Sequence, residues 1–278
     1  MQTRTSPSHS IRCICTKVAT LTLNKISTAA AIFTLCLFLC PSLAAQSRAA
    51  KTPAHPKTIP SSRSASTTPR PVPAFYRNVI VLDPAHGGTD TGAVLDDGLL
   101  EKNVVLSFSA RLRTALTTAG FTVLTTRDND SANALSAGQR AGIANHARPL
   151  ACLLLHATGS DSGVHIVTSD LPAVDRGNGY APRRWQTAQA TSILESLTLA
   201  GELSAAFKNA KPAPKLSVVQ MRASVPPIDN LISAAVAIEI APASRTVAVT
   251  NDAYQQRIVA GIVKALTAFR AEHEGTGE

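Results

Sequence analysis

The chain has 278 residues, of which 45% are hydrophobic and 16% charged, the composition of an ordinary globular protein. Its net charge is +9, but the excess lies in residues 1–75, which hold nine basic side chains and no acidic one, so residues 76–278 are formally neutral. A basic segment on a neutral domain does not form the basic face that nucleic acid requires, and we expect no nucleic-acid partner. Four of the five cysteines precede residue 41, and Cys152 alone cannot close an internal disulfide, which excludes a disulfide framework.

Residues 1–45 have the pattern of a secretory signal peptide. Scattered Arg and Lys precede a short apolar run at 29–40, and small residues follow around Ala44 and Ala45. The run is shorter than the roughly 20 residues that a membrane-spanning helix needs. We therefore predict a periplasmic or secreted protein, with no stable membrane insertion after cleavage. An uncleaved anchor is the alternative.

Residues 46–75 consist of Ala, Ser, Thr, Pro, Lys and Arg, with almost no large apolar side chains. Such a segment cannot bury a core, and we predict a disordered linker. The folded domain is predicted to span residues 76–274.

From Tyr76 onward, short apolar runs alternate with segments of helical periodicity. Strands are predicted at 79–83, 121–125, 150–155, 163–167, 216–221 and 234–240. Helices are predicted from Leu100 to a terminating Gly120, and over 136–147, 185–209 and 251–271. This alternation predicts a single three-layer α/β domain with a mostly parallel, twisted sheet flanked by helices.

Four polar residues stand at or near the ends of these predicted elements. His86 follows the first strand, His156 follows a run of leucines, and Glu239 is embedded in an apolar strand. Glu101 begins the first helix, where its charge suits the helix dipole. Each has an ordinary alternative, since a histidine after a strand can be a satisfied polar group and a glutamate can be a capping charge. Glu239 is the exception, because a buried carboxylate must be paired, metal-bound or protonated.

Together the four residues suggest a metal site. Two histidines, a carboxylate and a water form a catalytic zinc sphere, and a second carboxylate can act as a general base. The residues are far apart in the sequence, so their spacing alone is a weak signal. Asp83 either orients His86 or only ends its strand, and His165 is predicted to be structural or exposed.

Five segments carry a resemblance to a known family. They are IVLDPAHGGTDTGAV (80–94), LLEKNVVLSFSARL (99–112), GFTVLTTRDND (120–130), LLLHATGS (153–160) and AVAIEIAPAS (235–244). From Val79 to about Leu266 the chain resembles the zinc-dependent N-acetylmuramoyl-L-alanine amidases of the type-3 amidase family. The α/β fold of that family agrees with the fold predicted above.

The resemblance implies one zinc ion per chain, with His86, Glu101 and His156 as metal ligands and Glu239 as the catalytic residue. It implies peptidoglycan as the substrate, hydrolysis of the amide between N-acetylmuramic acid and L-alanine, and a possible activator protein as a partner. Two alternatives are a zinc-binding but inactive homologue with a wall-binding or regulatory role, and a different exported zinc hydrolase.

The chain departs from the family in three places. Ala85 replaces a glycine before the first histidine and would be strained if that position requires positive φ. Thr158 replaces an asparagine two residues after the second histidine, and Ile240-Ala241 replaces Gly-Phe. None of these positions is an implied metal ligand or the implied catalytic residue.

Overall fold

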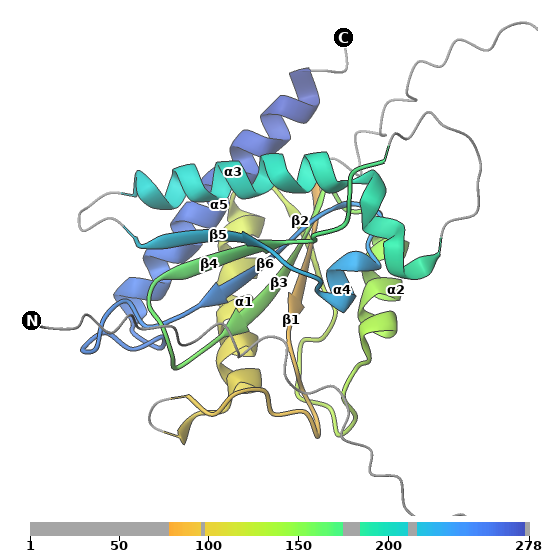
Figure 1. Ribbon diagram of the computed structural model, residues 1–278. Helices are drawn as coiled ribbons and strands as arrows, with labels where there is room; N and C mark the ends of the chain where they lie inside the picture. Colours follow the sequence, from red (N-terminus) through yellow and green to blue (C-terminus); the bar gives the residue numbers. More distant parts are fainter. Residues whose placement is uncertain (1–77, 96–97, 175–183, 211–215, 276–278) are drawn as a thin grey trace, which may run out of the picture. The chain divides into compact units, whose positions relative to one another are not determined.

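The computed structural model describes residues 78–95, 98–174, 184–210 and 216–275, which form an α/β domain (Figure 1). The signal peptide and linker predicted for 1–45 and 46–75 lie outside these residues. Among the described residues, no helix is both long and apolar enough to span a membrane.

The centre of the domain is a six-stranded sheet with the strand order β2-β1-β3-β6-β4-β5. The strands are β1 (Val79–Pro84), β2 (Thr122–Thr125), β3 (Ala151–Ala157), β4 (Val164–Thr168), β5 (Val218–Arg222) and β6 (Ala234–Ile240). All neighbouring pairs are parallel except β4 and β6, which are antiparallel. The predicted mostly parallel sheet is confirmed.

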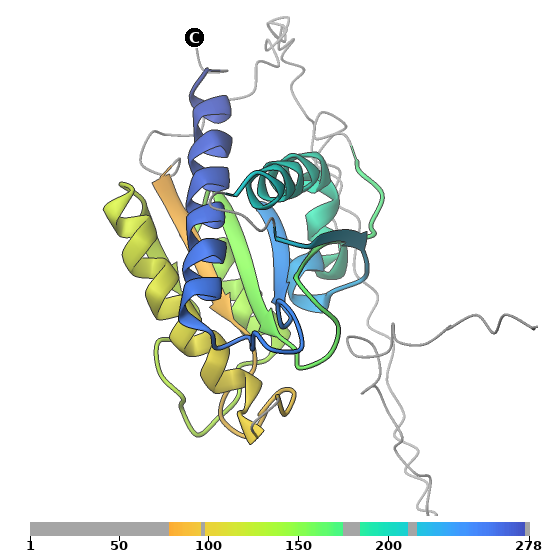
Figure 2. The same cartoon turned by 90° about the vertical axis from the view of Figure 1, so that its left-hand side faces the viewer.

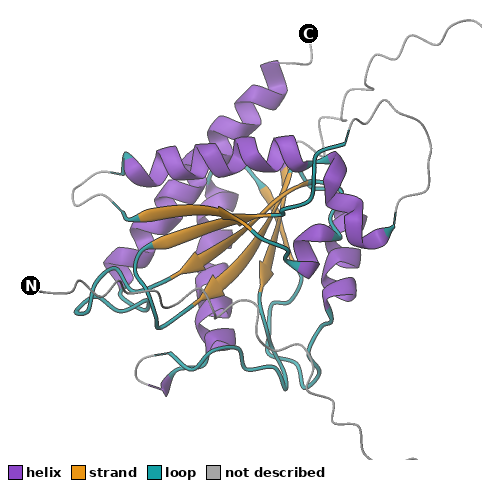
Figure 3. Ribbon diagram, in the orientation of Figure 1, coloured by secondary structure: helices purple, strands orange, loops and turns teal. Residues whose placement is uncertain are grey.

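Helices cover both faces of this sheet, and Figure 3 shows the strands as one twisted sheet with helices on either side. They are α1 (Glu101–Thr118), α2 (Ala137–Ala147), η3 (Trp185–Thr191), α3 (Ile193–Lys208), α4 (Pro226–Asp229) and α5 (Asp252–Gly275). Figure 2 shows α1 and α5 running along the sheet.

Strand alternation divides the apolar residues between two cores. Ile80 and Leu82 of β1 belong to a large core with α1, α3 and α5, whereas Val81 belongs to a smaller core with α2 and α4. The free thiol of Cys152 is buried in the smaller core. Because successive side chains of a strand point to opposite faces, both faces of the central strands are apolar and covered, as in other parallel sheets.

The helix predicted over 185–209 is broken into η3 and α3. Ser192 has the non-helical φ of −123° between them. Its hydroxyl donates to the Ile232 carbonyl, and the buried Gln189 amide donates to Ser196 and to the Ser233 carbonyl. These bonds to the segment before β6 compete with helix continuation, a tertiary effect that periodicity does not reveal.

The two ends of the domain lie side by side. Arg270, near the end of α5, has Nη1 3.2 Å from Oδ1 of Asn78, directly before β1. Its guanidinium also lies over the ring of Phe121, 4.3 Å from the centroid. The start of β1 is therefore held against the last turns of α5.

Helices α3 and α5 touch at Gly261. A Cβ atom at this position would lie 2.5 Å from Cδ1 of the fully buried Phe207. A Cβ atom added at Gly201 on α3 would have no atom within 4 Å.

We therefore expect Gly261→Ala and Gly201→Ala to change stability in opposite directions. The exposed Gly201→Ala gains helix propensity and stabilises the protein by about 0.5–1 kcal/mol. In Gly261→Ala the cost of overpacking, about 1–3 kcal/mol, exceeds that gain. Urea denaturation measures both, and equal stabilisation by the two substitutions would contradict the close helix contact.

Candidate metal centre

The turn that presents His86 is held by two arginines. Nε and Nη2 of Arg127 donate to the carbonyls of Pro84 and Ala85 at 2.9 and 2.8 Å. Arg140 of α2 donates to the carbonyls of Pro84 and His86. His86 has a φ of +60°, which costs about 1–2 kcal/mol for a residue with a Cβ atom. The arginine hydrogen bonds fix this strained turn at the carboxyl end of β1.

Asp83 acts on the turn indirectly. Its Oδ1 accepts from Nη1 of Arg140 at 2.5 Å and from the hydroxyl of Thr126, with both charged side chains buried. No direct hydrogen bond joins Asp83 to the His86 ring. The interpretation that Asp83 orients this ring by direct contact is therefore not supported. At Nδ1 the partner of the His86 ring is Asp90, whose Oδ2 lies 2.9 Å away. The sequence analysis did not single out Asp90.

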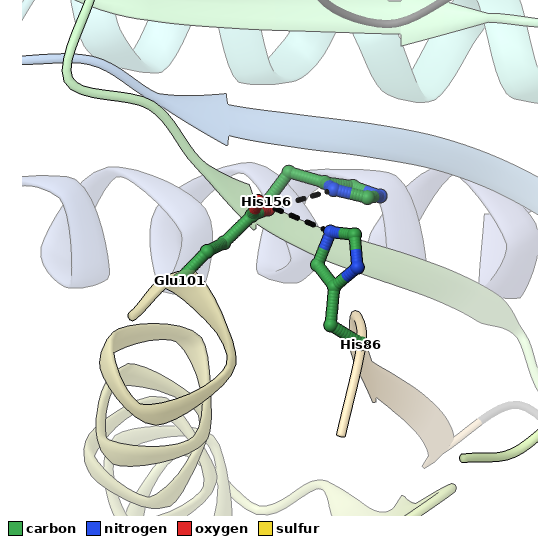
Figure 4. Close-up of side chains that lie close together, drawn as sticks. All are labelled: His86, Glu101 and His156. Carbon is green, nitrogen blue, oxygen red and sulfur yellow. Dashed lines mark hydrogen bonds and ion pairs between the residues drawn. The ribbon is translucent and has the colours of Figure 1, made fainter. Parts of the chain in front are cut away.

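Glu101 stands at the start of α1 between the two histidines (Figure 4). Its Oε2 lies 3.1 Å from Nε2 of His86 and its Oε1 lies 3.0 Å from Nδ1 of His156. The same oxygens accept the backbone N–H groups of Ala93 and Ala157 at 2.9 and 3.1 Å. Three segments of the chain thus meet at one carboxylate.

The electrostatics keep this carboxylate ionised. Burial alone would raise the pKa of Glu101, but hydrogen bonds and charges from His156 and His86 hold it far below its ordinary value. Burial likewise would lower the pKa of His86, but Glu101 and Asp90 raise it. The cluster therefore attracts positive charge, whether as a proton or as a cation.

The three side chains fit a single metal ion. One ligand atom from each of His86, Glu101 and His156 lies within 4.8 Å of the others. Ligands 2.0–2.1 Å from a tetrahedral zinc ion lie about 3.3 Å apart, close to the distances between the Glu101 oxygens and the two rings. The bond between Asp90 and Nδ1 of His86 leaves Nε2 for a metal, the arrangement usual for metal-binding histidines.

Gly92 makes room for this cluster. A Cβ atom here would lie 2.6 Å from both Oε2 of Glu101 and Cδ2 of His86, and the φ of Gly92 is +66°. A larger residue would push two of the three candidate ligands apart.

Glu239 lies outside the three-residue cluster, on the neighbouring strand. It pairs in register with His156 of β3 on one side and His165 of β4 on the other. Paired residues point to the same face of a sheet, so the three side chains form a row. Oε2 of Glu239 lies 2.9 Å from Nδ1 of His165. His165 is buried rather than exposed. Its contact with Glu239 was not predicted from the sequence.

The departures from the family are accommodated locally. Ala85 does not have a positive φ, and His86 takes that conformation instead. The strain considered for Ala85 therefore does not arise. Thr158 is buried, and its hydroxyl accepts the Ser160 N–H at 3.2 Å. Ala241, after β6, accepts a hydrogen bond from the hydroxyl of Tyr254.

The fold and the cluster define an α/β domain with three clustered side chains that could hold one metal ion. The profile of the N-acetylmuramoyl-L-alanine amidase family Amidase_3 matches residues 80–268, and the chain belongs to this family.

Curated relatives match over shorter segments. AmiC of Neisseria meningitidis serogroup B is 45% identical over 67 residues, which are 23% of this chain and 16% of AmiC. AmiA of Escherichia coli K12 is 44% identical over 55 residues, which are 20% of this chain and 19% of AmiA. These matches span less than a fifth of either relative.

Solved structures share the fold over most of the domain. Ami1 of Mycobacterium smegmatis has a TM-score of 0.53 and 21% identity, covering 70% of this chain and 97% of that chain. AmiC2 of Nostoc punctiforme has a TM-score of 0.50 and 19% identity, covering 69% and 97%. The three-layer fold predicted from the sequence is thus found in proteins named as amidases.

We expect Gly92→Ala to weaken metal binding, because its Cβ atom displaces Glu101 and His86. The affinity for Zn²⁺ should fall about 10- to 100-fold, the usual loss when the support of a metal ligand is removed. Isothermal titration calorimetry measures the affinity, and circular dichroism verifies the fold.

Gly98→Ala is the matched control for Gly92→Ala. Gly98 also has a positive φ, +71°, but no atom lies within 4 Å of its added Cβ. It carries the same backbone strain, about 1–2 kcal/mol, without the contact. Equal Zn²⁺ affinities for the two variants would contradict the role assigned to Gly92.

Proposed function

We propose that this chain is a zinc-dependent peptidoglycan hydrolase. It cleaves the amide that joins the lactyl group of N-acetylmuramic acid to L-alanine of the stem peptide. The observation that carries the proposal is the meeting of His86, Glu101 and His156 at the carboxyl ends of β1 and β3, in a chain that belongs to an amidase family.

In this proposal each site residue has a role that its position supports. His86, Glu101 and His156 hold the zinc ion, and the anionic Glu101 offsets part of its charge. When bound, zinc polarises the scissile carbonyl and lowers the pKa of a water molecule to around 7. Asp90 keeps the His86 ring in the orientation that presents Nε2.

Glu239 is the proposed general base. It takes a proton from the attacking water as the water oxygen bonds to the carbonyl carbon. It then gives that proton to the leaving nitrogen as the C–N bond breaks, which frees the amino group of L-alanine. Its register pairing with His156, a proposed metal ligand on the neighbouring strand, supports this role.

Export and partners are further parts of the proposal. Peptidoglycan lies outside the cytoplasm, so the signal peptide proposed for 1–45 and the linker at 46–75 would deliver the domain at 76–274 to its substrate. The protein would then be periplasmic or secreted, and an activator protein could control it. The inactive wall-binding homologue is not favoured, because all four proposed site residues are present and three of them form one cluster.

The test compares the full chain with Glu239→Gln. We expect about one zinc ion per chain in both proteins. The parent should release intact stem peptides with a free L-alanine amino group from purified sacculi. Glu239→Gln should hydrolyse them about 10²- to 10⁴-fold more slowly, the usual contribution of a general base.

Glu272→Gln, a change of an exposed glutamate on α5, is the control and should keep full activity. Mass spectrometry of the products identifies the bond cleaved. Absence of zinc from the parent, or cleavage within the stem peptide, would contradict the proposal. Zinc in both proteins with no hydrolysis by either would favour the alternative function, a zinc-binding but inactive homologue.

A further inference from the structure

His165 lies between two carboxylates. Its Nδ1 is 2.9 Å from Oε2 of Glu239, and its Nε2 is 3.5 Å from Oδ2 of Asp161. The His165 side chain is only 5% exposed, whereas Asp161 is 64% exposed. The backbone of Asp161 has a φ of +69°, a conformation that aspartate tolerates better than most residues.

The two carboxylates act on the ring in different ways. Nδ1 of His165 lies at hydrogen-bond distance from Glu239, whereas Nε2 has no hydrogen-bond partner among the described residues and meets Asp161 only as an ion pair. A second proton on the ring would place an N–H at Nε2, beside the Asp161 carboxylate. The hydrogen bond with Glu239, aided by the charge of Asp161, raises the pKa of His165 above its ordinary value, although burial opposes this. On β5, the register neighbour of His165 is the apolar Val219. Among the described residues, the charged groups found to face the ring are therefore Glu239 and Asp161.

The contact between His165 and Glu239 gives the two carboxylate oxygens of Glu239 different surroundings. Oε2 is occupied by His165, and no hydrogen bond to Oε1 is found among the described residues. A carboxylate held through one oxygen has its rotation restricted and keeps the other oxygen for chemistry.

We propose that His165 is a positioning residue, which binds Oε2 of Glu239 as an imidazolium and leaves Oε1 to receive the proton of the attacking water. This inference rests on the proposed function. His165 keeps both of its protons throughout, and the transferred proton passes from water to Oε1 and then to the leaving nitrogen. The hydrogen bond fixes the orientation of the Glu239 carboxylate.

Two substitutions separate the charge from the hydrogen bond. His165→Val removes both, and valine suits a buried strand. His165→Asn can place an amide N–H near the former Nδ1 but carries no charge. His146→Asn, a change of an exposed histidine on α2, is the control.

We expect His165→Val to bind zinc normally, to keep its KM and to lose about 10- to 100-fold in kcat, the range for a hydrogen bond to a charged group. His165→Asn should recover part of kcat, because its amide N–H can restore the hydrogen bond to Glu239. His146→Asn should match the parent in all respects.

A purely structural role would not lower kcat at constant KM, and asparagine would not rescue it. A parent-like kcat in His165→Val would overturn the proposal, as would loss of zinc from both His165 variants, since His165 would then act on the metal site.

A second measurement does not depend on activity. Nitrogen-15 NMR of the zinc-loaded full chain should show both His165 ring nitrogens protonated at pH 6, with a ring pKa above about 6.5 that falls in Glu239→Gln. A ring pKa at or below that value in the parent would overturn the pairing. An inactive parent would instead contradict the proposed function, and the NMR titration would still decide whether the pair exists.

Discussion

The geometry of the site depends on the hydrogen bonds that Arg127 and Arg140 make to the carbonyls of residues 84–86. These bonds hold His86 in a left-handed conformation that a histidine does not adopt readily. Arg140 is itself buried against Asp83, and removing one partner from such a pair typically costs about 3–5 kcal/mol. Through this pair and its neighbours, the ends of β1 and β2 and the start of α2 form one rigid support for the first candidate ligand.

The candidate ligands form part of an alternating series of charges. Asp90, His86, Glu101 and His156 follow one another at 2.9–3.1 Å, so acidic and basic groups are interleaved. Although burial would lower the pKa of His86, Glu101 and Asp90 raise it, so a metal ion bound at Nε2 of His86 would compete with a proton there. Occupancy of the candidate site would therefore depend on pH.

Much of the molecule could be predicted from local patterns. Apolar runs located the strands, helical periodicity located α1, α2 and α5, and polar residues at strand ends indicated where His86 and His156 would meet. The break before α3 was not predictable, because it depends on bonds from Gln189 and Ser192 to a segment forty residues away. The place of His165 was not predictable either. It depends on β6 lying between β3 and β4 with antiparallel pairing to β4, and periodicity within one strand carries no information about its neighbours.

The contact between Asn78 and Arg270 joins the two ends of the domain at the end of β1 opposite to His86. A strand of six residues is about 20 Å long, so both ends of the domain lie far from the candidate ligands. Attachment through either end would therefore be made at a distance from the candidate ligands. The same proximity makes the domain suited to circular permutation, in which a short peptide connects the old ends and new ones open in a distant surface loop.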